Sequence, residues 1–191
     1  IFIWGATPAV SQMQIMHFIT EAHQNGANVV TIDPLYNANA ALSDKYVPIR
    51  SATDGALALG MMNIVLQQGW EDVDFITPDS IAQPVIEGTV DLDGQTLTTS
   101  YSLLRGRIAE WPASRASEAT GIPEADIEEL ARLYACETPS TIHTCFGADH
   151  YYNGHWNYSC MVALALLTGN VGVSGAGIGV CNAAGTNALN M

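Results

Sequence analysis

Short apolar runs alternate with longer helical patterns over the first third of the chain, and this alternation limits the possible folds more than any other feature. Residues 1–4 and 29–32 are continuous apolar or β-branched runs, typical of strands buried on both faces, and 46–49 is a third strand candidate. Between the first two runs, apolar residues recur at intervals of three over 10–24, which predicts a helix covering one face of a sheet. A second helix is predicted over 55–68. Strands and helices in this order indicate a parallel sheet with right-handed crossovers.

The same pattern returns in the second half of the chain after an interruption. A helix is predicted over 123–136, a strand over 141–146 and a further helix over 153–168. Between 77 and 107, prolines and glycines mark turns, and 96–101 is expected to form a small hairpin arm. We therefore interpret this middle segment as an excursion from the main fold.

The predicted fold class is α/β: a three-layer α/β/α sandwich with a mainly parallel, Rossmann-like sheet. We expect three parts: residues 1–76 form a first α/β half that carries the binding loops, 77–115 an insertion, and 116–191 a second α/β half with a glycine-rich exit loop. The exit loop is expected because six glycines lie between Gly169 and Gly185. These glycines do not have the G-x-G-x-x-G spacing of a dinucleotide fingerprint.

Charge and composition exclude several classes of function. The net charge is −13 with only six Lys and Arg residues, which argues against a nucleic-acid-binding face and against a polybasic membrane contact. The longest apolar run, 160–167, is too short to span a bilayer. The four cysteines, at 136, 145, 160 and 181, stand singly without metal-site or cluster spacing.

The candidate binding residues follow the predicted strands. Ligands of open parallel sheets bind beyond the carboxyl ends of the strands, and small or polar residues occupy four such junctions, at 5–8, 33–34, 50–54 and 147–150. The first and third lead into helices, whose backbone N–H groups can receive a phosphate. Asp33 is of the type that holds a ribose hydroxyl, and Asp54 matches the N1–H and amino group of a guanine. Alternatively, Asp33 only shapes the turn before Pro34, and Asp54 only caps its helix.

Catalytic and metal-binding patterns are not found in this sequence. His143, His150 and His155 lie near Cys145, but no i, i+4 pair of metal ligands occurs among them. A Walker sequence and a G-x-S-x-G elbow are also missing. We therefore predict no catalytic residue and no metal ligand in this chain.

Four sequence blocks in a fixed order cover nearly all of the chain outside the excursion. They are W-G-A-T-P at 4–8, I-D-P at 32–34 with I-R-S-A-T-D-G-A-L-A-L-G-M at 49–61, T-G-I-P at 120–123 with E-L-A at 129–131, and Gly147 with L-T-G-N-V-G at 167–172. These blocks resemble the W-G-x-N-P loop, the I-D-P strand end, the I-R-P-G-T-D-x-A-L-x-x-G-M segment and the later motifs of the dimethyl sulfoxide reductase family of molybdopterin oxidoreductases.

The resemblance implies a bis-molybdopterin guanine dinucleotide cofactor that carries molybdenum or tungsten. By matching position, the cofactor-binding residues would be Gly5, Thr7, Asp33, Pro34, Ser51 and Asp54, with Gly147 and His150 in a loop near the pterin phosphates. Three positions differ from the family: Thr7 replaces asparagine, Ser51 and Ala52 replace Pro–Gly, and Leu35 stands where a basic residue is common.

The resemblance also implies parts that lie outside this sequence. Because the chain opens at Ile1 inside a predicted strand, we expect it to be an internal fragment of a bacterial oxidoreductase, inactive when isolated. A 4Fe-4S cluster, the metal ligand and the remaining domains are expected elsewhere in the polypeptide, and an iron–sulfur electron-transfer subunit is the expected partner. The periplasm or cell envelope is the favoured location, with the cytoplasm as the alternative.

Three alternative functions are considered. A metal-free relative, such as the large subunit of a respiratory complex, would have no need of the guanine contact that Thr53 and Asp54 imply. A nicotinamide-binding dehydrogenase domain would carry G-x-G-x-x-G. A non-redox hydratase or transhydroxylase of the same family is not distinguished by this region of sequence.

Overall fold

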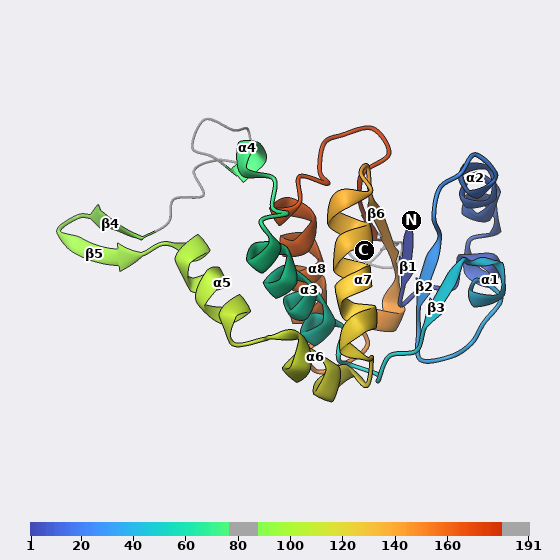
Figure 1. Cartoon of the computed structure of the whole chain (residues 1–191), viewed down its shortest axis with the longest axis horizontal. Helices are drawn as coiled ribbons and strands as arrows, with labels where there is room; N and C mark the ends of the chain where they lie inside the picture. The colour runs from blue at the N-terminus through green and yellow to red at the C-terminus, as the bar shows by residue number, and fades with distance from the viewer. Residues whose placement is uncertain (77–87, 181–191) are drawn as a thin grey trace, which may run out of the picture.

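The computed structural model describes residues 1–76 and 88–180, and at its centre is a five-stranded, parallel sheet (Figure 1). Its strands are β1 (Phe2–Trp4), β2 (Val30–Ile32), β3 (Lys45–Val47), β6 (Thr141–Thr144) and β7 (Gly177–Val180). The strand order is β3-β2-β1-β6-β7. The chain therefore builds outward from β1 to β3 and then returns to the other side of β1. This reversal between β1 and β6 is the switch point where ligands bind in open α/β sheets.

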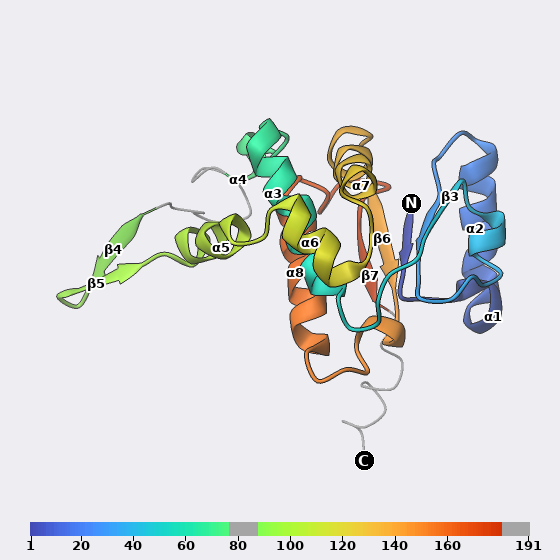
Figure 2. The same ribbon diagram turned by 60° about the horizontal axis from the view of Figure 1, so that its bottom comes forward.

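Helices cover both faces of the sheet and give the molecule three layers (Figure 1, Figure 2). One face carries α1 (Pro8–Ser11), α2 (Met13–Gln24) and the 3-10 turn η1 (Ala40–Leu42). The other face carries α3 (Asp54–Gln68), α7 (Glu124–Cys136) and α8 (Gly154–Leu167), with α6 (Ala113–Thr120) against α3 and α7. The predicted three-layer α/β fold is confirmed.

The core forms because successive strand residues point to opposite faces of the sheet. In β1, Phe2 and Trp4 join the large apolar cluster under α3, α7 and α8, whereas Ile3 joins the smaller cluster under α2. The α3 sequence is apolar on all sides, and the helix is accordingly buried from Asp54 through Val65 apart from Ala56. The large cluster thus fixes where α3 begins relative to the sheet.

Three further elements lie outside the sheet and the helices named above. They are α4 (Val73–Ile76), α5 (Ser100–Ala109) and the 3-10 turn η2 (Phe146–Ala148). The excursion carries an antiparallel hairpin of β4 (Thr89–Leu92) and β5 (Gln95–Thr98), which lies away from the three layers in both views (Figure 1, Figure 2). Within the described residues, no helix has the length and apolar character needed to cross a membrane.

Two helix predictions need correction. The helix predicted over 10–24 is broken at Gln12, whose φ of −147° and ψ of 55° are not helical, so α1 and α2 are separate. Val10 and Met13 are exposed. Helix α6 was not predicted, because its eight residues are mostly small and polar, with no large aliphatic side chain to mark a helix.

Two strand and loop predictions are also wrong in part. The hairpin spans 89–98 rather than 96–101, so only its second strand overlaps the expected segment. Tyr101 belongs to α5, where the Thr99 side chain accepts a hydrogen bond from the Ser102 N–H. The glycine-rich tail was predicted as loop, but Gly177–Val180 forms β7. Glycine has a low intrinsic preference for strands, and the hydrogen bonds of β7 with β6 override that preference. The rest of that tail, from 181 on, lies outside the described residues, as do Pro78, Pro84 and Cys181.

Candidate functional site

The four predicted junctions lie at one edge of the sheet. Strands β1, β2, β3 and β6 are parallel neighbours, so the loops that follow them, at 5–8, 33–34, 50–54 and 147–150, all leave from the carboxyl edge. The two predicted acids, Asp33 and Asp54, lie in the loops after the neighbouring strands β2 and β3, and Asp33 contributes to raising the pKa of Asp54. All eight predicted site residues lie in these loops, and Asp54, at the end of the third loop, is also the first residue of α3.

The Asp54 carboxylate is held inside the protein rather than at a helix cap. Thr53 is the N-cap of α3 and makes no side-chain cap bond, so the alternative that Asp54 caps the helix is wrong. Its Oδ1 accepts a hydrogen bond from the Trp4 indole N–H at 2.8 Å, and only 6% of the residue is exposed. Burial raises the pKa of this carboxyl above its usual value, the Trp4 hydrogen bond opposes the shift, and Asp33 adds to it.

Asn157, in the first turn of α8, connects two of the loops, 50–54 and 147–150, and was not singled out in the sequence. Its Oδ1 accepts from the Gly55 N–H at 3.0 Å, while its Nδ2 donates to the Ala148 carbonyl at 2.9 Å and to Asp54 Oδ2 at 3.4 Å. The side chain is fully buried. A buried amide satisfied on both ends fixes the spacing of its partners. Asn157 therefore positions the Asp54 carboxylate relative to β6 and α3.

Asp33 is more accessible than Asp54 and shapes its own turn. Its Oδ1 accepts the Leu35 N–H at 2.8 Å, and its carbonyl accepts from the Tyr46 hydroxyl at 3.1 Å. The alternative that Asp33 organises the turn around Pro34 is therefore confirmed as one of its roles. Burial raises the pKa of Asp33, and the Leu35 hydrogen bond opposes that shift. The residue is half-buried, so a ligand can reach it.

The loops after β1 and β6 touch backbone to backbone at the switch point. A Cβ on Gly147 would lie 2.4 Å from the Gly5 carbonyl oxygen, and a Cβ on Gly5 would lie 3.0 Å from the Ala148 nitrogen. Gly5 also has a φ of +61°, which favours glycine. Both predicted glycines are thus required by the close approach of the two loops.

The first loop is held by a second buried asparagine that the sequence did not reveal. Asn39 donates from Nδ2 to the Ala6 carbonyl at 3.0 Å and accepts the Ala9 N–H at 2.9 Å. The Gly5 N–H donates to the Ile32 carbonyl within the sheet. Since proline has no N–H, Ala6 and Thr7 supply the backbone donors that remain among residues 5–8 in the described chain. Of the backbone donors that the sequence predicted for a phosphate in this loop, only the N–H groups of Ala6 and Thr7 are therefore left.

The loop that carries Ser51 differs from the prediction. The N–H groups of Gly55, Ala56 and Leu57 at the start of α3 all donate within the chain, so this helix start does not offer them to a phosphate. Ser51 is exposed, and Ala52 has a φ of +68° where the family motif has glycine. The turn thus keeps a left-handed residue despite the substitution.

The predicted histidines do not converge on one point. His150 is exposed and stacks on the Phe146 ring with centroids 5.3 Å apart, while His143 Nε2 lies 2.7 Å from Gln12 Oε1 toward α2. In the described part of the chain, no three His, Cys, Asp or Glu side chains are grouped so as to hold a metal ion.

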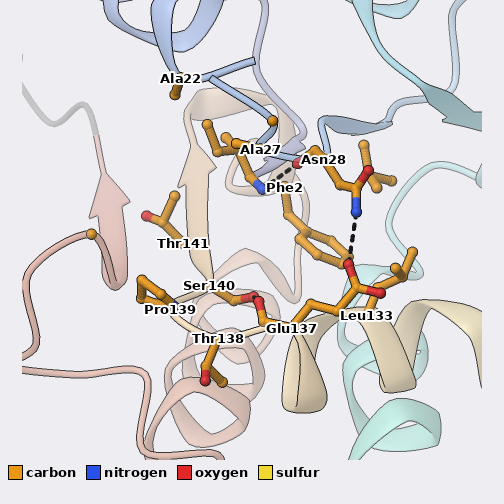
Figure 3. A pocket seen from close by; sticks show the side chains of 14 residues that line it. Phe2, Ala22, Ala27, Asn28, Leu133, Glu137, Thr138, Pro139, Ser140 and Thr141 are labelled. Atoms are coloured by element: carbon orange, nitrogen blue, oxygen red, sulfur yellow. Dashed lines mark hydrogen bonds between the residues drawn. The ribbon is translucent and has the colours of Figure 1, made fainter. Parts of the chain in front are cut away.

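A pocket of about 510 Å³ lies at the opposite edge of the sheet and is not this site (Figure 3). Phe2 and Thr141, the first residues of β1 and β6, line it, together with Glu137. The Asn28 side chain donates to Glu137 Oε2 at 2.7 Å across it (Figure 3). None of the predicted site residues contributes to its walls.

The raised pKa of Asp54 leads to a testable pH dependence. The folded state holds the Asp54 proton to higher pH than the unfolded state, so this carboxyl lowers stability as pH rises from its usual pKa of 3.8 through its raised value. We expect Asp54→Asn to match the parent near pH 4 and to be more stable at neutral pH by about 1 kcal/mol. Thermal unfolding measured from about pH 4 to 8 checks this. A variant equally destabilised at every pH would show that the Trp4 hydrogen bond outweighs the cost of burial.

Comparison with solved structures agrees with this architecture. The chain superposes on the acetylene hydratase of Pelobacter acetylenicus with a TM-score of 0.71 and 20% identity, over 88% of this chain and 21% of that one. At this identity the likeness establishes the fold. The parallel sheet with helices on both faces defines an α/β class of protein, and its switch point is where ligands of such sheets bind.

The family follows from the sequence comparison. The chain belongs to the molybdopterin oxidoreductase family, whose model matches residues 1–191. It is 28% identical to the probable oxidoreductase YoaE of Bacillus subtilis over 87% of this chain, and 25% identical to the perchlorate reductase subunit alpha of Dechloromonas aromatica over 93%. It is 30% identical to the putative dimethyl sulfoxide reductase chain YnfE of Escherichia coli over 94%.

These matches confirm the resemblance to the dimethyl sulfoxide reductase family and argue against a nicotinamide-binding dehydrogenase. The chain spans only 22%, 28% and 23% of the length of these three relatives. It is therefore homologous to one part of each relative.

Proposed function

We propose that this chain binds the guanine end of a molybdopterin guanine dinucleotide, as one part of a longer oxidoreductase subunit. The observation that carries the proposal is the placement of two acids, Asp33 and Asp54, in the loops that follow neighbouring parallel strands at the same edge of the sheet. Family membership supplies the cofactor class, and the acids supply the complementarity to guanine.

The chemistry of the two acids fits a guanine base. Guanine presents an N1–H and an exocyclic amino group side by side, and an ionised carboxylate offers only acceptors. Asp33 is the accessible partner of the two, whereas Asp54 Oδ1 is already engaged by Trp4. Each carboxylate oxygen accepts more than one hydrogen bond, so Asp54 retains acceptor capacity. Donors from the base would also offset the mutual repulsion of the two acids.

This chain offers few cationic or N–H groups to the phosphates of the same cofactor. Arg50 is the one cation within the four loops, and its guanidinium donates to the Glu118 and Ala119 carbonyls at the end of α6. The Ala6 and Thr7 N–H groups remain as donors. We infer that positive charge for the pyrophosphate comes from residues outside this chain, where the longer relatives have three quarters of their length.

The chain's own residues bind and orient rather than react. The bound metal would supply oxygen-atom, hydride or hydroxyl transfer. Asn157 and Asn39 hold the loops in place, Asp33 and Asp54 accept from the base, and Gly147 and His150 lie in the loop after β6 at the same edge. The metal ligand, a 4Fe-4S cluster and an iron–sulfur partner subunit belong to the proposal but not to this chain, which is expected to show no turnover alone.

Asp33→Asn in the complete polypeptide tests this function. Losing one charge-assisted contact to guanine should weaken cofactor retention by roughly tenfold to a hundredfold. The measurement is GMP released by acid hydrolysis per polypeptide after gel filtration. Asp93→Asn is the matched control, because it makes the same change in the distant hairpin, where Asn–Gly suits the turn. Equal GMP content in both variants, or none in the parent protein, would contradict the proposal.

A further inference from the structure

The hairpin of β4 and β5 is a well-defined element that has few contacts with the rest of the described chain. Its turn is formed by Asp93 and Gly94, with φ values of 50° and 79°, which suit a two-residue hairpin loop. The Thr96 hydroxyl donates to Asp91 Oδ1 across the two strands at 2.7 Å. Every residue of both strands is exposed, and both views show the hairpin away from the three layers (Figure 1, Figure 2).

The two faces of this hairpin differ in character. Val90 lies opposite Leu97, and Leu92 shares their face at the next position along β4. These three side chains make this the apolar face, and they are 39%, 42% and 61% exposed in the order Val90, Leu97, Leu92. Gln95, opposite Leu92, is the one polar side chain that the two strands place on the same face. The opposite face carries Asp91 with three threonines, at 89, 96 and 98.

An amphipathic two-stranded hairpin implies a surface that covers its apolar side. A hairpin of two strands is marginally stable alone, and three or more strands or packing against another element are usually required. Burying aliphatic side chains that are grouped on one face would lower the free energy of the folded protein, because apolar surface would be removed from water. The polar face already has the character of a solvent-exposed surface. The apolar face is therefore the one that contacts another surface.

We propose that the apolar face of Val90, Leu92 and Leu97 docks onto another part of the same polypeptide. Three aliphatic side chains fall far short of the roughly 800 Å² per partner that holds separate proteins together. An intramolecular contact needs less area, because the chain already holds the two surfaces at high effective concentration. The relatives have about three quarters of their length outside the matched region. A longer polypeptide of this kind contains further domains whose surfaces the hairpin can contact.

The surface that receives the hairpin should be apolar at its centre and free of acidic groups at its border. The hairpin carries Asp91 and Asp93 and no cation, so acidic groups facing it would be repelled. The inference rests on that part of the proposed function which places the chain in a longer polypeptide. It does not depend on guanine binding. Cofactor content measured on the same protein samples therefore distinguishes a failure of the proposed docking from a failure of the proposed guanine binding.

Hydrogen–deuterium exchange of residues 88–99 in the complete polypeptide tests the docking. Leu97→Glu places a charge on the apolar face, and Thr98→Glu places the same charge one residue away on the polar face. We expect slow exchange in the parent protein and in Thr98→Glu, and exchange about tenfold faster or more in Leu97→Glu, since a leucine contact of this kind is lost.

Three results would overturn the proposal. They are fast exchange of the hairpin in the unmodified complete polypeptide, equal exchange in the two variants, and slow exchange only at high protein concentration or only with a co-purified subunit. The third result would assign the contact to a second copy or to a separate subunit. Sedimentation at two protein concentrations distinguishes those cases.

Discussion

Replacing Asn157 with leucine is expected to lower the free energy of unfolding by about 3–5 kcal/mol, because several buried polar groups lose their partner at once. The Gly55 N–H, the Ala148 carbonyl and Asp54 Oδ2 all contact this one side chain. Leucine is of similar size but neither donates nor accepts, so these groups stay buried without compensation. Chemical denaturation of the purified protein measures the loss.

Ser159→Leu is the control for this substitution. Ser159 is exposed on the same helix, and its hydroxyl donates only to the His155 carbonyl one turn earlier. We expect a change within about 0.5 kcal/mol. Hydrogen exchange adds a positional readout: Asn157→Leu should accelerate exchange at 53–57 and 147–150 more than in the second half of α8. Uniform acceleration along α8, or a loss no larger than the control's, would refute the positioning role.

Gly147→Ala is expected to separate the loops after β1 and β6, because its Cβ would lie 2.4 Å from the Gly5 carbonyl oxygen. The atom in the way belongs to the backbone, so no side-chain rotation relieves the contact. We expect a loss of about 1–3 kcal/mol in stability together with lower cofactor retention. Thermal unfolding and GMP content are the two measurements.

Gly106→Ala provides the comparison, because an added Cβ at this position in α5 meets nothing within 4 Å. A helical glycine replaced by alanine should gain about 0.5–1 kcal/mol. The two substitutions are chemically identical, so opposite signs would assign the loss at Gly147 to the contact with Gly5. If both variants gain stability, the loops do not depend on that contact.

The sequence was sufficient to predict the features that follow from local pattern and parallel topology. Runs such as 29–32 identify buried strands, and parallel strands must present their carboxyl ends together, so Asp33 and Asp54 were expected at one edge. The parallel pairing of β2 with β3 places both acids at that edge. Their roles as ligands for guanine and ribose stay predictions.

The residues that hold the site together were not predicted, because their partners are distant in sequence. Trp4 and Asp54 are 50 residues apart, Gly55 and Asn157 are 102 apart, and Ala6 and Asn39 are 33 apart. One signal was available: Asn157 sits in a helix that is otherwise largely apolar, and a buried amide requires partners. The buried Trp4 indole N–H likewise required an acceptor.

The contact between Gly5 and Gly147 also limits how the two loops can diverge among relatives of this chain. Because each backbone fills the space where the other's side chain would stand, a larger residue at either position requires both loops to shift. We therefore expect both glycines to be retained together in related chains. The stretch after Pro34 is under no such limit, since Leu35 and Tyr36 are exposed, and it is the part of this edge where we expect sequences to vary most.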